Sequence, residues 1–262
     1  MTEPAAGNDT WIRRFHPASE AATRLVCFPH AGGSATFYFP VSATLSPGVE
    51  VLTVQYPGRQ DRRNEPPIDD IPSLADAVFE ALRPWLADRP ALFGHSMGSI
   101  VAFEVARRME EHGTPPRVLV ASGRRAPSRY RGEGVHLRDD DGVLAELRKL
   151  SGTDPRLLAD EELQRMVLPA IRSDYRAIET YRHLADAPPL SCPITVFVGD
   201  DDSQVTLEEA KAWQEHTAGA FDLQLFEGGH FYLADRPAAT IERLSEVLSD
   251  HAQPGGDHAP AR

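Results

Sequence analysis

Short apolar runs alternate with amphipathic helical patterns along most of this chain. Runs typical of strands occupy residues 25–28, 49–54, 91–93, 118–121, 194–198 and 222–226. Helical patterns occupy residues 73–86 and 96–111, and two more begin near Thr206 and at Pro237. Strands that alternate with helices form a largely parallel sheet covered on both faces. The sequence therefore predicts an α/β fold whose ligand site lies beyond the carboxyl ends of the strands.

Two helix starts carry capping signals. Ser73 with Asp76, and Thr206 with Glu209, have the spacing of capping boxes, in which the two side chains satisfy free backbone N–H groups. These pairs predict where two of the helices begin.

One segment, residues 132–190, breaks the alternation because it contains helical patterns and no convincing strand. An insertion on the active-site side is typical of a lid. We expect one wall of the substrate pocket to come from Leu163, Met166 and Val167, and a kink at Pro169. The remaining boundaries predict a flexible N-terminus over 1–10, one domain over 11–251 that includes the lid, and a disordered tail over 252–262.

Composition excludes several classes of protein. Of the 262 residues, 41% are hydrophobic, which suffices for a sizeable core, and the net charge of −12 argues against nucleic acid as the main partner. No apolar run is long enough for a membrane helix, and the polar start lacks a signal peptide, so a cytoplasmic monomer is expected. Cys27 and Cys192 have no metal-binding spacing and are expected to be buried, reduced thiols.

The segment Gly94-His-Ser-Met-Gly98 matches the GxSxG pattern, with a predicted strand before it and a long helix after it. This context is that of the nucleophile elbow of α/β-hydrolases, a tight turn that lifts Ser96 into the cleft. Flanking glycines are needed because side chains there would clash. The alternative interpretation is a glycine-rich helix start with a capping serine.

A serine nucleophile needs a base and an acid, which in this fold follow it in the order acid, then histidine. His230 lies after the last predicted strand and is the one well-placed histidine. Asp200, Asp201 and Asp202 all follow the strand that ends at Gly199. The carboxylate must turn back toward the imidazole, which favours Asp202 and places Asp201 second.

The oxyanion hole requires two backbone N–H donors. Met97 follows the nucleophile and supplies one, and the small-residue loop after the first recognised strand supplies the other, for which we select Ala31. His30 and His95 lie beside these motifs, and both are interpreted as structural because they precede the acid. Nothing in the sequence requires a metal or a cofactor.

Several segments together resemble the type II thioesterases, the editing enzymes of polyketide and nonribosomal peptide synthesis. They are Phe28-Pro-His-Ala-Gly-Gly33, Gln55-Tyr-Pro-Gly-Arg59, Gly94 to Gly98, Pro193 to Asp202, Phe226 to Leu233, Leu168 to Tyr175 and Glu179-Thr-Tyr181. The resemblance implies hydrolysis of acyl groups from the phosphopantetheine arm of acyl or peptidyl carrier proteins. It also implies the triad Ser96, Asp202 and His230, with Ala31 and Met97 as oxyanion donors.

Two other functions remain open from the sequence: a carboxylesterase of small esters with the same triad, and a non-catalytic binding protein of the same fold. Seven arginines in two clusters follow predicted strands: Arg59, Arg62 and Arg63, and Arg124, Arg125, Arg129 and Arg131. They are hypothesised to form a basic rim for the carrier protein or the phosphate of its arm. The alternative is that they pair with nearby acidic residues or are solvated.

Overall fold

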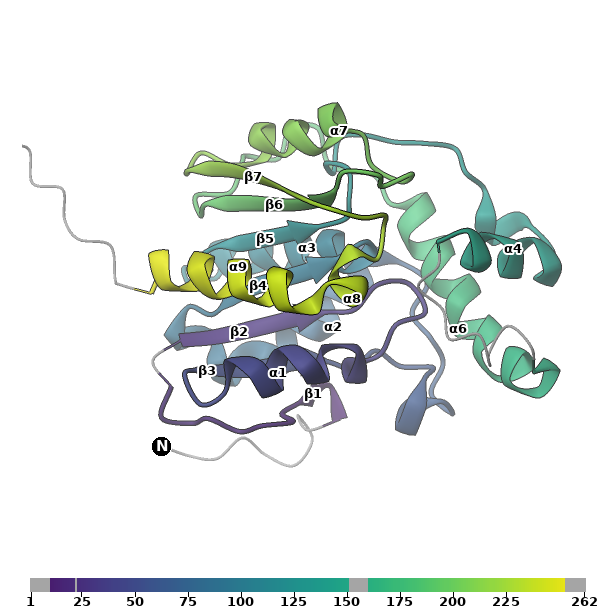
Figure 1. Ribbon diagram of the computed structural model, residues 1–262, viewed down its shortest axis with the longest axis horizontal. Helices are drawn as coiled ribbons and strands as arrows, with labels where there is room; N and C mark the ends of the chain where they lie inside the picture. The colour runs from purple at the N-terminus through teal and green to yellow at the C-terminus, as the bar shows by residue number, and fades with distance from the viewer. Residues whose placement is uncertain (1–9, 22, 151–159, 253–262) are drawn as a thin grey trace, which may run out of the picture.

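The computed structural model describes residues 10–21, 23–150 and 160–252. Its centre is a sheet of seven strands in the order β1-β3-β2-β4-β5-β6-β7 (Figure 1). The strands are β1 (Ile12–Arg13), β2 (Thr23–Phe28), β3 (Val49–Val54), β4 (Ala91–His95), β5 (Leu119–Ser122), β6 (Ile194–Gly199) and β7 (Phe221–Phe226). Only the pairing of β1 with β3 is antiparallel among these strands. The carboxyl ends of the six parallel strands therefore meet at one edge.

Helices cover both faces of this sheet, with α1, α8 and α9 on one face and α2 and α3 on the other (Figure 1). The α-helices are α1 (Phe39–Leu45), α2 (Ile71–Leu82), α3 (Met97–Glu111), α4 (Asp140–Leu150), α6 (Glu161–Thr180), α7 (Leu207–Lys211), α8 (Tyr232–Asp235) and α9 (Pro237–Asp250). This is the predicted doubly covered α/β sheet, and the α/β-hydrolase fold expected from the sequence is confirmed.

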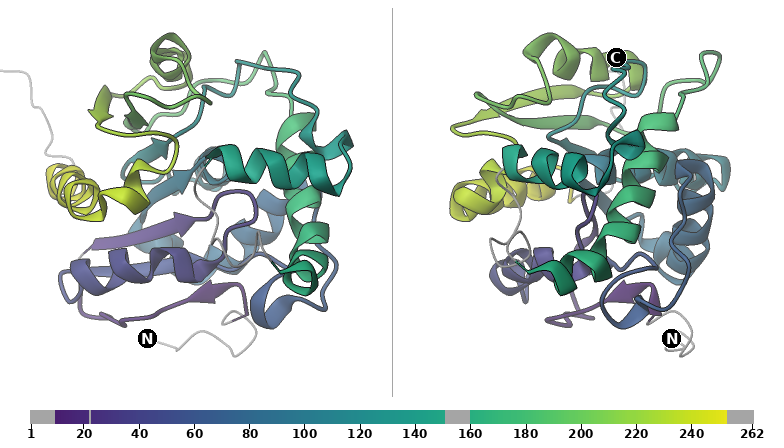
Figure 2. Two further views of the ribbon diagram at one scale, coloured as in Figure 1. Left: turned by 45° about the vertical axis from the view of Figure 1, so that its right-hand side comes forward. Right: turned by 90° about the vertical axis from the view of Figure 1, so that its right-hand side faces the viewer.

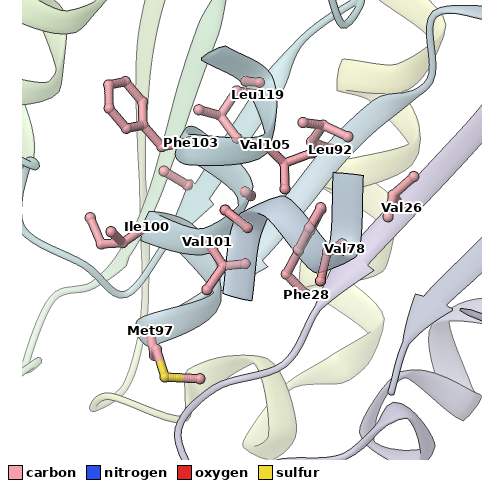
Figure 3. Close-up of a cluster of buried hydrophobic side chains, with 14 of the residues drawn as sticks. Val26, Phe28, Val78, Leu92, Met97, Ile100, Val101, Phe103, Val105 and Leu119 are labelled. Atoms are coloured by element: carbon pink, nitrogen blue, oxygen red, sulfur yellow. The ribbon is translucent and has the colours of Figure 1, made fainter. Parts of the chain in front are cut away.

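The core divides between the two faces as the alternation of side chains along a strand requires. In β2, Val26 and Phe28 join the cluster that packs under α2 and α3, and Leu25 and Cys27 join the cluster under α1 and α9. Figure 3 shows the first cluster, in which apolar side chains of α3 meet those of β2 and β4. Because α3 is anchored this way, its N-terminus has a fixed position at the carboxyl edge of the sheet.

The insertion between β5 and β6 lies at that same edge, where α4 and α6 project beyond the sheet (Figure 2). The two helices share a small core of their own, which includes Val143 and Leu147 from α4 and Leu168 and Ile171 from α6. α6 is a single helix of 20 residues that continues through Pro169. The predicted helical insertion is therefore present over the ends of the strands, and we call α4 and α6 the lid helices.

The predicted strands and one of the two predicted capping boxes are confirmed, and the other capping box is wrong. All six predicted strands are present, and Thr206 with Glu209 forms the predicted capping box. The capping box at Ser73 and Asp76 was wrong, because α2 begins at Ile71 and Asp70 caps it by accepting the N–H of Ser73. Pro72 lies in the first turn of α2, where proline is tolerated because its missing N–H would have no acceptor within the helix.

The strand β1 and the helix α1 were not predicted. Both are too short, at two and seven residues, to show a recognisable period in the sequence. The expected flexible and disordered ends fall almost wholly on residues 1–9 and 253–262, which lie outside the described residues. Among the helices of the described segments, none has the length and apolarity needed to cross a membrane.

Candidate active site

Ser96 occupies a strained turn between β4 and α3. Its φ of 54° and ψ of −119° lie in a region that non-glycine residues rarely adopt. A Cβ on Gly94 would lie 2.2 Å from the carbonyl oxygen of Gly98, and one on Gly98 would lie 2.1 Å from that of Phe28. Both glycines of the GxSxG pattern are therefore required by backbone atoms that no side-chain movement could relieve.

Hydrogen bonds from β5 and α3 hold this turn in place. The N–H of Ser96 donates to the carbonyl of Ser122 at 2.8 Å. The hydroxyl of Ser99, fully buried, lies 2.8 Å from the carbonyl of Gly94 and accepts the N–H of Ser122 at 3.1 Å. Sequence reasoning missed Ser99, although a serine three residues into a helix that must pack closely under its own turn is a usable signal.

The three residues predicted as a triad come together across three loops. His230 Nε2 lies 3.1 Å from Ser96 Oγ, and His230 Nδ1 lies 2.9 Å and 3.1 Å from the two carboxylate oxygens of Asp202. The side chains of His230 and Asp202 are almost fully buried, whereas Ser96 is partly exposed. This is the connectivity of a hydroxyl nucleophile, a base and an acid that orients the base.

The three consecutive aspartates have separate structural roles. Asp202 is buried, and its Oδ1 also accepts the N–H of Gln204 at 2.8 Å, which fixes its orientation. Asp200 is exposed and accepts the N–H of Gly228 at 2.9 Å, so it shapes the loop that leads to His230. Asp201 is exposed. The predicted register thus matches the geometry, because only Asp202 is within hydrogen-bonding distance of the imidazole.

A cavity of about 190 Å³ opens at the serine. Ser96, Ala31, Met97 and His230 all line it. Met97 is the first residue of α3, so its N–H has no acceptor within the helix. The two predicted oxyanion donors therefore border the cavity that contains the nucleophile, at the positive end of the α3 dipole.

The lid helices form the apolar wall of this cavity, with Leu147 and Leu150 from α4 and Ile171, Tyr175 and Ile178 from α6. The expected wall of Leu163, Met166 and Val167 was wrong. Those residues lie in the first turns of α6 and do not line the cavity; Met166 is 55% exposed. The predicted face of the helix is correct, but the cavity lies one to three turns further along it.

The polar residues that line the cavity are Arg124, Glu133, Glu179 and Gln204. Glu179 accepts the backbone N–H of Val135 at 2.8 Å, and Glu133 accepts from Arg125 at 2.8 Å. Burial lowers the pKa of Arg124 to about 9, although nearby glutamates raise it. Arg124 and Glu179 belong to segments singled out in the sequence, but neither was predicted to line the cavity, and Glu133 and Gln204 were not predicted as site residues.

His30 and His95 are buried beside the triad. The ring of His95 lies 5.1 Å from that of His230, and its Nδ1 lies 2.9 Å from Ser122 Oγ. Burial lowers the pKa of His30 to about 3, and electrostatic interactions with His230 and Arg59 lower it further. Burial likewise lowers the pKa of His95 far below its ordinary value. Both imidazoles are neutral at physiological pH. This agrees with the structural role predicted for them.

Most of the arginines in the two clusters are paired. Salt bridges join Arg59 to Asp174, Arg62 to Glu65, Arg125 to Glu133, Arg129 to Glu215 and Arg131 to Glu209. Only Arg63 and Arg124 form no ion pair with another described residue. The alternative interpretation, pairing with nearby acids, therefore holds for five of the seven, and the basic rim is largely neutralised.

Residues suited to holding a metal do not gather here. Within residues 10–21, 23–150 and 160–252, no three His, Cys, Asp or Glu side chains form a group that could bind one. Cys27 and Cys192 are free and buried as expected, and burial raises the pKa of the Cys192 thiol to about 12. Burial also raises the pKa of the Cys27 thiol, so both cysteines are held in the thiol form, which is a poor nucleophile.

The sheet order, the strained elbow and the linked serine, histidine and aspartate define a class of protein: a serine hydrolase of the α/β-hydrolase fold. A family model described as a thioesterase domain matches residues 23–248. The chain belongs to this thioesterase family, and the resemblance to its type II members found in the sequence is confirmed.

Individual relatives support the assignment. The chain is 54% identical over 249 residues to a probable cadicidin biosynthesis thioesterase of Streptomyces griseus, covering 93% of this chain and 68% of that protein. It is 54% identical over 243 residues to thioesterase PikA5 of Streptomyces venezuelae, covering 92% and 85%. Among solved structures, the type II thioesterase BorB from the borrelidin biosynthetic cluster matches with a TM-score of 0.86 and 54% identity, covering 92% of this chain and 98% of that one.

Proposed function

We propose that this chain hydrolyses acyl thioesters carried on the phosphopantetheine arm of acyl or peptidyl carrier proteins, with Ser96 as nucleophile, His230 as base and Asp202 as the acid that orients it. The observation that carries the proposal is the continuous hydrogen-bonded path from Ser96 Oγ through His230 to Asp202. Relatives named for biosynthetic pathways, the probable cadicidin biosynthesis thioesterase and BorB from the borrelidin biosynthetic cluster, support the carrier-bound substrate.

The proposed mechanism gives each of these residues one role. Ser96 Oγ attacks the thioester carbonyl while His230 Nε2 takes the hydroxyl proton, and Asp202 stabilises the resulting imidazolium. The negatively charged oxygen of the tetrahedral intermediate accepts hydrogen bonds from the backbone N–H groups of Ala31 and Met97. Collapse of the intermediate breaks the carbon–sulfur bond, and His230 returns its proton to the departing thiolate. Water, activated by the same imidazole, then hydrolyses the acyl-serine and releases the carboxylic acid.

The size and character of the cavity suggest the acyl group. At about 190 Å³ it is smaller than the pockets of about 300–1,000 Å³ that enclose drug-sized ligands. Its apolar wall comes from the lid helices, including Ile171 and Ile178. We infer that short acyl groups fit this state of the enzyme, with the pantetheine arm reaching in from solvent.

The test is Ser96→Ala, assayed by mass spectrometry of release from an acylated carrier protein. Loss of the nucleophile lowers turnover by several orders of magnitude. Circular dichroism confirms that the variant is folded. Retention of more than about a tenth of wild-type turnover would exclude the serine as nucleophile.

The carboxylesterase alternative makes a different prediction. Comparing kcat/KM for an acyl-carrier protein with that for a simple ester of the same acyl group separates them. The proposal requires a preference for the carrier-bound thioester, and equal or greater turnover of the simple ester would favour the alternative. The third possibility, a non-catalytic binding protein, predicts no turnover of either substrate.

The proposal also includes a cytoplasmic location and a monomeric state. The two free, buried thiols support the cytoplasmic location, because disulfides are rare in that compartment.

A further inference from the structure

The loop that contains Ala31 is held in shape by side chains from distant parts of the chain. The N–H of Gly32 donates to Oδ2 of Asp174 at 2.8 Å, and the carbonyl of Gly33 accepts from Arg59 at 3.1 Å. Further along, the N–H of Ala35 donates to the side chain of Gln55 at 2.9 Å. The backbone directly after Ala31 is therefore fixed by contacts from outside its own loop.

Asp174 and Arg59 are also bonded to each other. The guanidinium donates to both carboxylate oxygens, at 2.7 Å and 2.8 Å. Asp174 is 1% exposed and Arg59 is 9% exposed. Burial opposes the charge on Arg59, but the charge and hydrogen bonds of Asp174 outweigh it and raise the pKa of the guanidinium. Arg59 and Asp174 therefore form a buried, bidentate salt bridge.

The two partners belong to different parts of the fold. Asp174 is on the lid helix α6, and Arg59 lies in the loop after β3. The lid also packs directly on the loop, because a Cβ on Gly32 would lie 3.0 Å from the side chain of Ile171, one turn before Asp174. Stability alone is a weak reason for such a pair, since apolar residues of similar volume often stabilise a buried site equally well. A positional role accounts for it better.

We propose that Arg59 and Asp174 are positioning residues that couple the seating of lid helix α6 to the orientation of the oxyanion loop. With α6 seated, Asp174 holds the peptide of Gly32 and thereby aims the neighbouring N–H of Ala31 at the developing oxyanion. When α6 is displaced, this hydrogen bond is lost and the oxyanion hole is incomplete. The hydrolase is therefore fully active only with its lid helix in place over the acyl group.

This inference rests on the proposed function, because it assigns Ala31 the role of oxyanion donor. The main variant is Arg59→Met with Asp174→Leu, which removes both charges together and leaves neither buried alone. Truncating only one partner leaves the other charge buried and unpaired and risks unfolding, so the single variants are conservative substitutions. Asp174→Asn is the second variant, since its amide oxygen still accepts from Gly32 while the ion pair is lost. Arg59→Lys keeps the charge without the two-pronged geometry.

Two measurements are made on each variant. The first is kcat and KM for the propionyl thioester of N-acetylcysteamine, corrected by active-site titration with a fluorophosphonate. The second is amide hydrogen exchange of the peptide that contains Ala31 to Ala35. Removing an oxyanion donor outright costs about 100- to 1,000-fold in kcat. In the double variant the N–H of Ala31 is still present but is no longer held in the correct orientation. We therefore expect this variant to lose about 10- to 100-fold in kcat with little change in KM, and to show faster amide hydrogen exchange in this peptide. Asp174→Asn and Arg59→Lys should lie between it and the wild type.

The matched control is Arg14→Met with Glu50→Leu. This pair is also partly buried, joined at 2.6 Å, but it lies at the opposite end of β3. It should lose stability without losing kcat. A folded Arg59 and Asp174 double variant with wild-type kcat, or with a kcat loss equal to that of the control, overturns the coupling. Ser96→Ala run in parallel separates the two proposals: activity in that variant refutes the proposed function, whereas inactivity there with unchanged pair variants refutes only the coupling.

Discussion

The buried neutral histidines next to the triad predict a specific sensitivity to acid. In the folded protein, burial lowers the pKa of His30 to about 3, and electrostatic interactions with His230 and Arg59 lower it further. In the unfolded chain a histidine titrates near 6.5. The folded pKa is the lower one, so the unfolded state binds more protons between these values. The contribution of His30 to stability is therefore complete above about pH 6.5 and is lost as the pH falls toward 3.

The size of the effect follows from the same two values. At pH 5 the unfolded histidine is almost fully protonated and the folded one is not, which costs about 2 kcal/mol relative to pH 7.5. His30→Phe removes this titration and keeps an aromatic ring among the neighbouring rings of Phe37 and Phe231, whose centroids lie 4.7 Å and 4.9 Å away. It also removes Nδ1, a buried nitrogen with no hydrogen-bond partner among the described residues.

The assay is urea unfolding at pH 7.5 and pH 5, for the wild type, His30→Phe and the control Phe37→Leu. The wild type loses stability on acidification, and His30→Phe should lose about 2 kcal/mol less between the two pH values. Phe37→Leu alters packing in the same cluster without removing a titrating group, so it should shift stability equally at both. An identical acid-dependent loss in the wild type and His30→Phe would show that His30 is not held neutral by the fold.

Two further predictions concern the acid and the lid. Asp202→Asn should lower kcat by about 10⁴-fold because the imidazole loses the partner that fixes its tautomer, whereas Asp201→Asn should change kcat little. Steady-state kinetics on the folded variants test this, and a large loss of kcat in Asp201→Asn would refute the choice of Asp202. Ile178→Ala enlarges the cavity and should raise kcat/KM for a longer acyl thioester relative to a short one by about 10-fold or more, while Met166→Ala, exposed on the same helix, should leave that ratio unchanged. Equal ratios in both variants would place the acyl group elsewhere.

The catalytic order could be predicted from the sequence because it depends on local features. A strand, a glycine-flanked turn and a helix within a short segment identify Ser96, and the loop after a strand limits the acid to three neighbouring residues. The choice of Asp202 among them follows from reach: the first residue after Gly199 still points along the strand, whereas the third can turn toward His230. Such reasoning needs only the geometry of strand ends.

The lid shows where this reasoning stops. The periodic spacing identified the correct face of α6, since Ile171, Asp174 and Ile178 continue the stripe that begins at Leu163. A period does not say what a helix packs against along its length. The first turns of α6 leave Met166 exposed, and only the later turns reach the cavity. The same stripe is therefore solvent-facing at one end and substrate-facing at the other.

The pairing of charged residues is the property that is hardest to predict from this sequence. The parallel topology nevertheless explains why Arg59 and Asp174 meet. Arg59 and Asp174 are separated by 115 positions, and nothing in either segment identifies the other as its partner. Yet the loops after β2 and β3, and the insertion after β5, all leave the sheet at one edge. An insertion after β5 therefore begins near the loop that contains Ala31, since both leave the sheet close to Ser96. In this protein the lid packs on that loop through Ile171, and Asp174 adds a defined hydrogen bond to Gly32, so the proposed coupling follows from where the topology places the insertion.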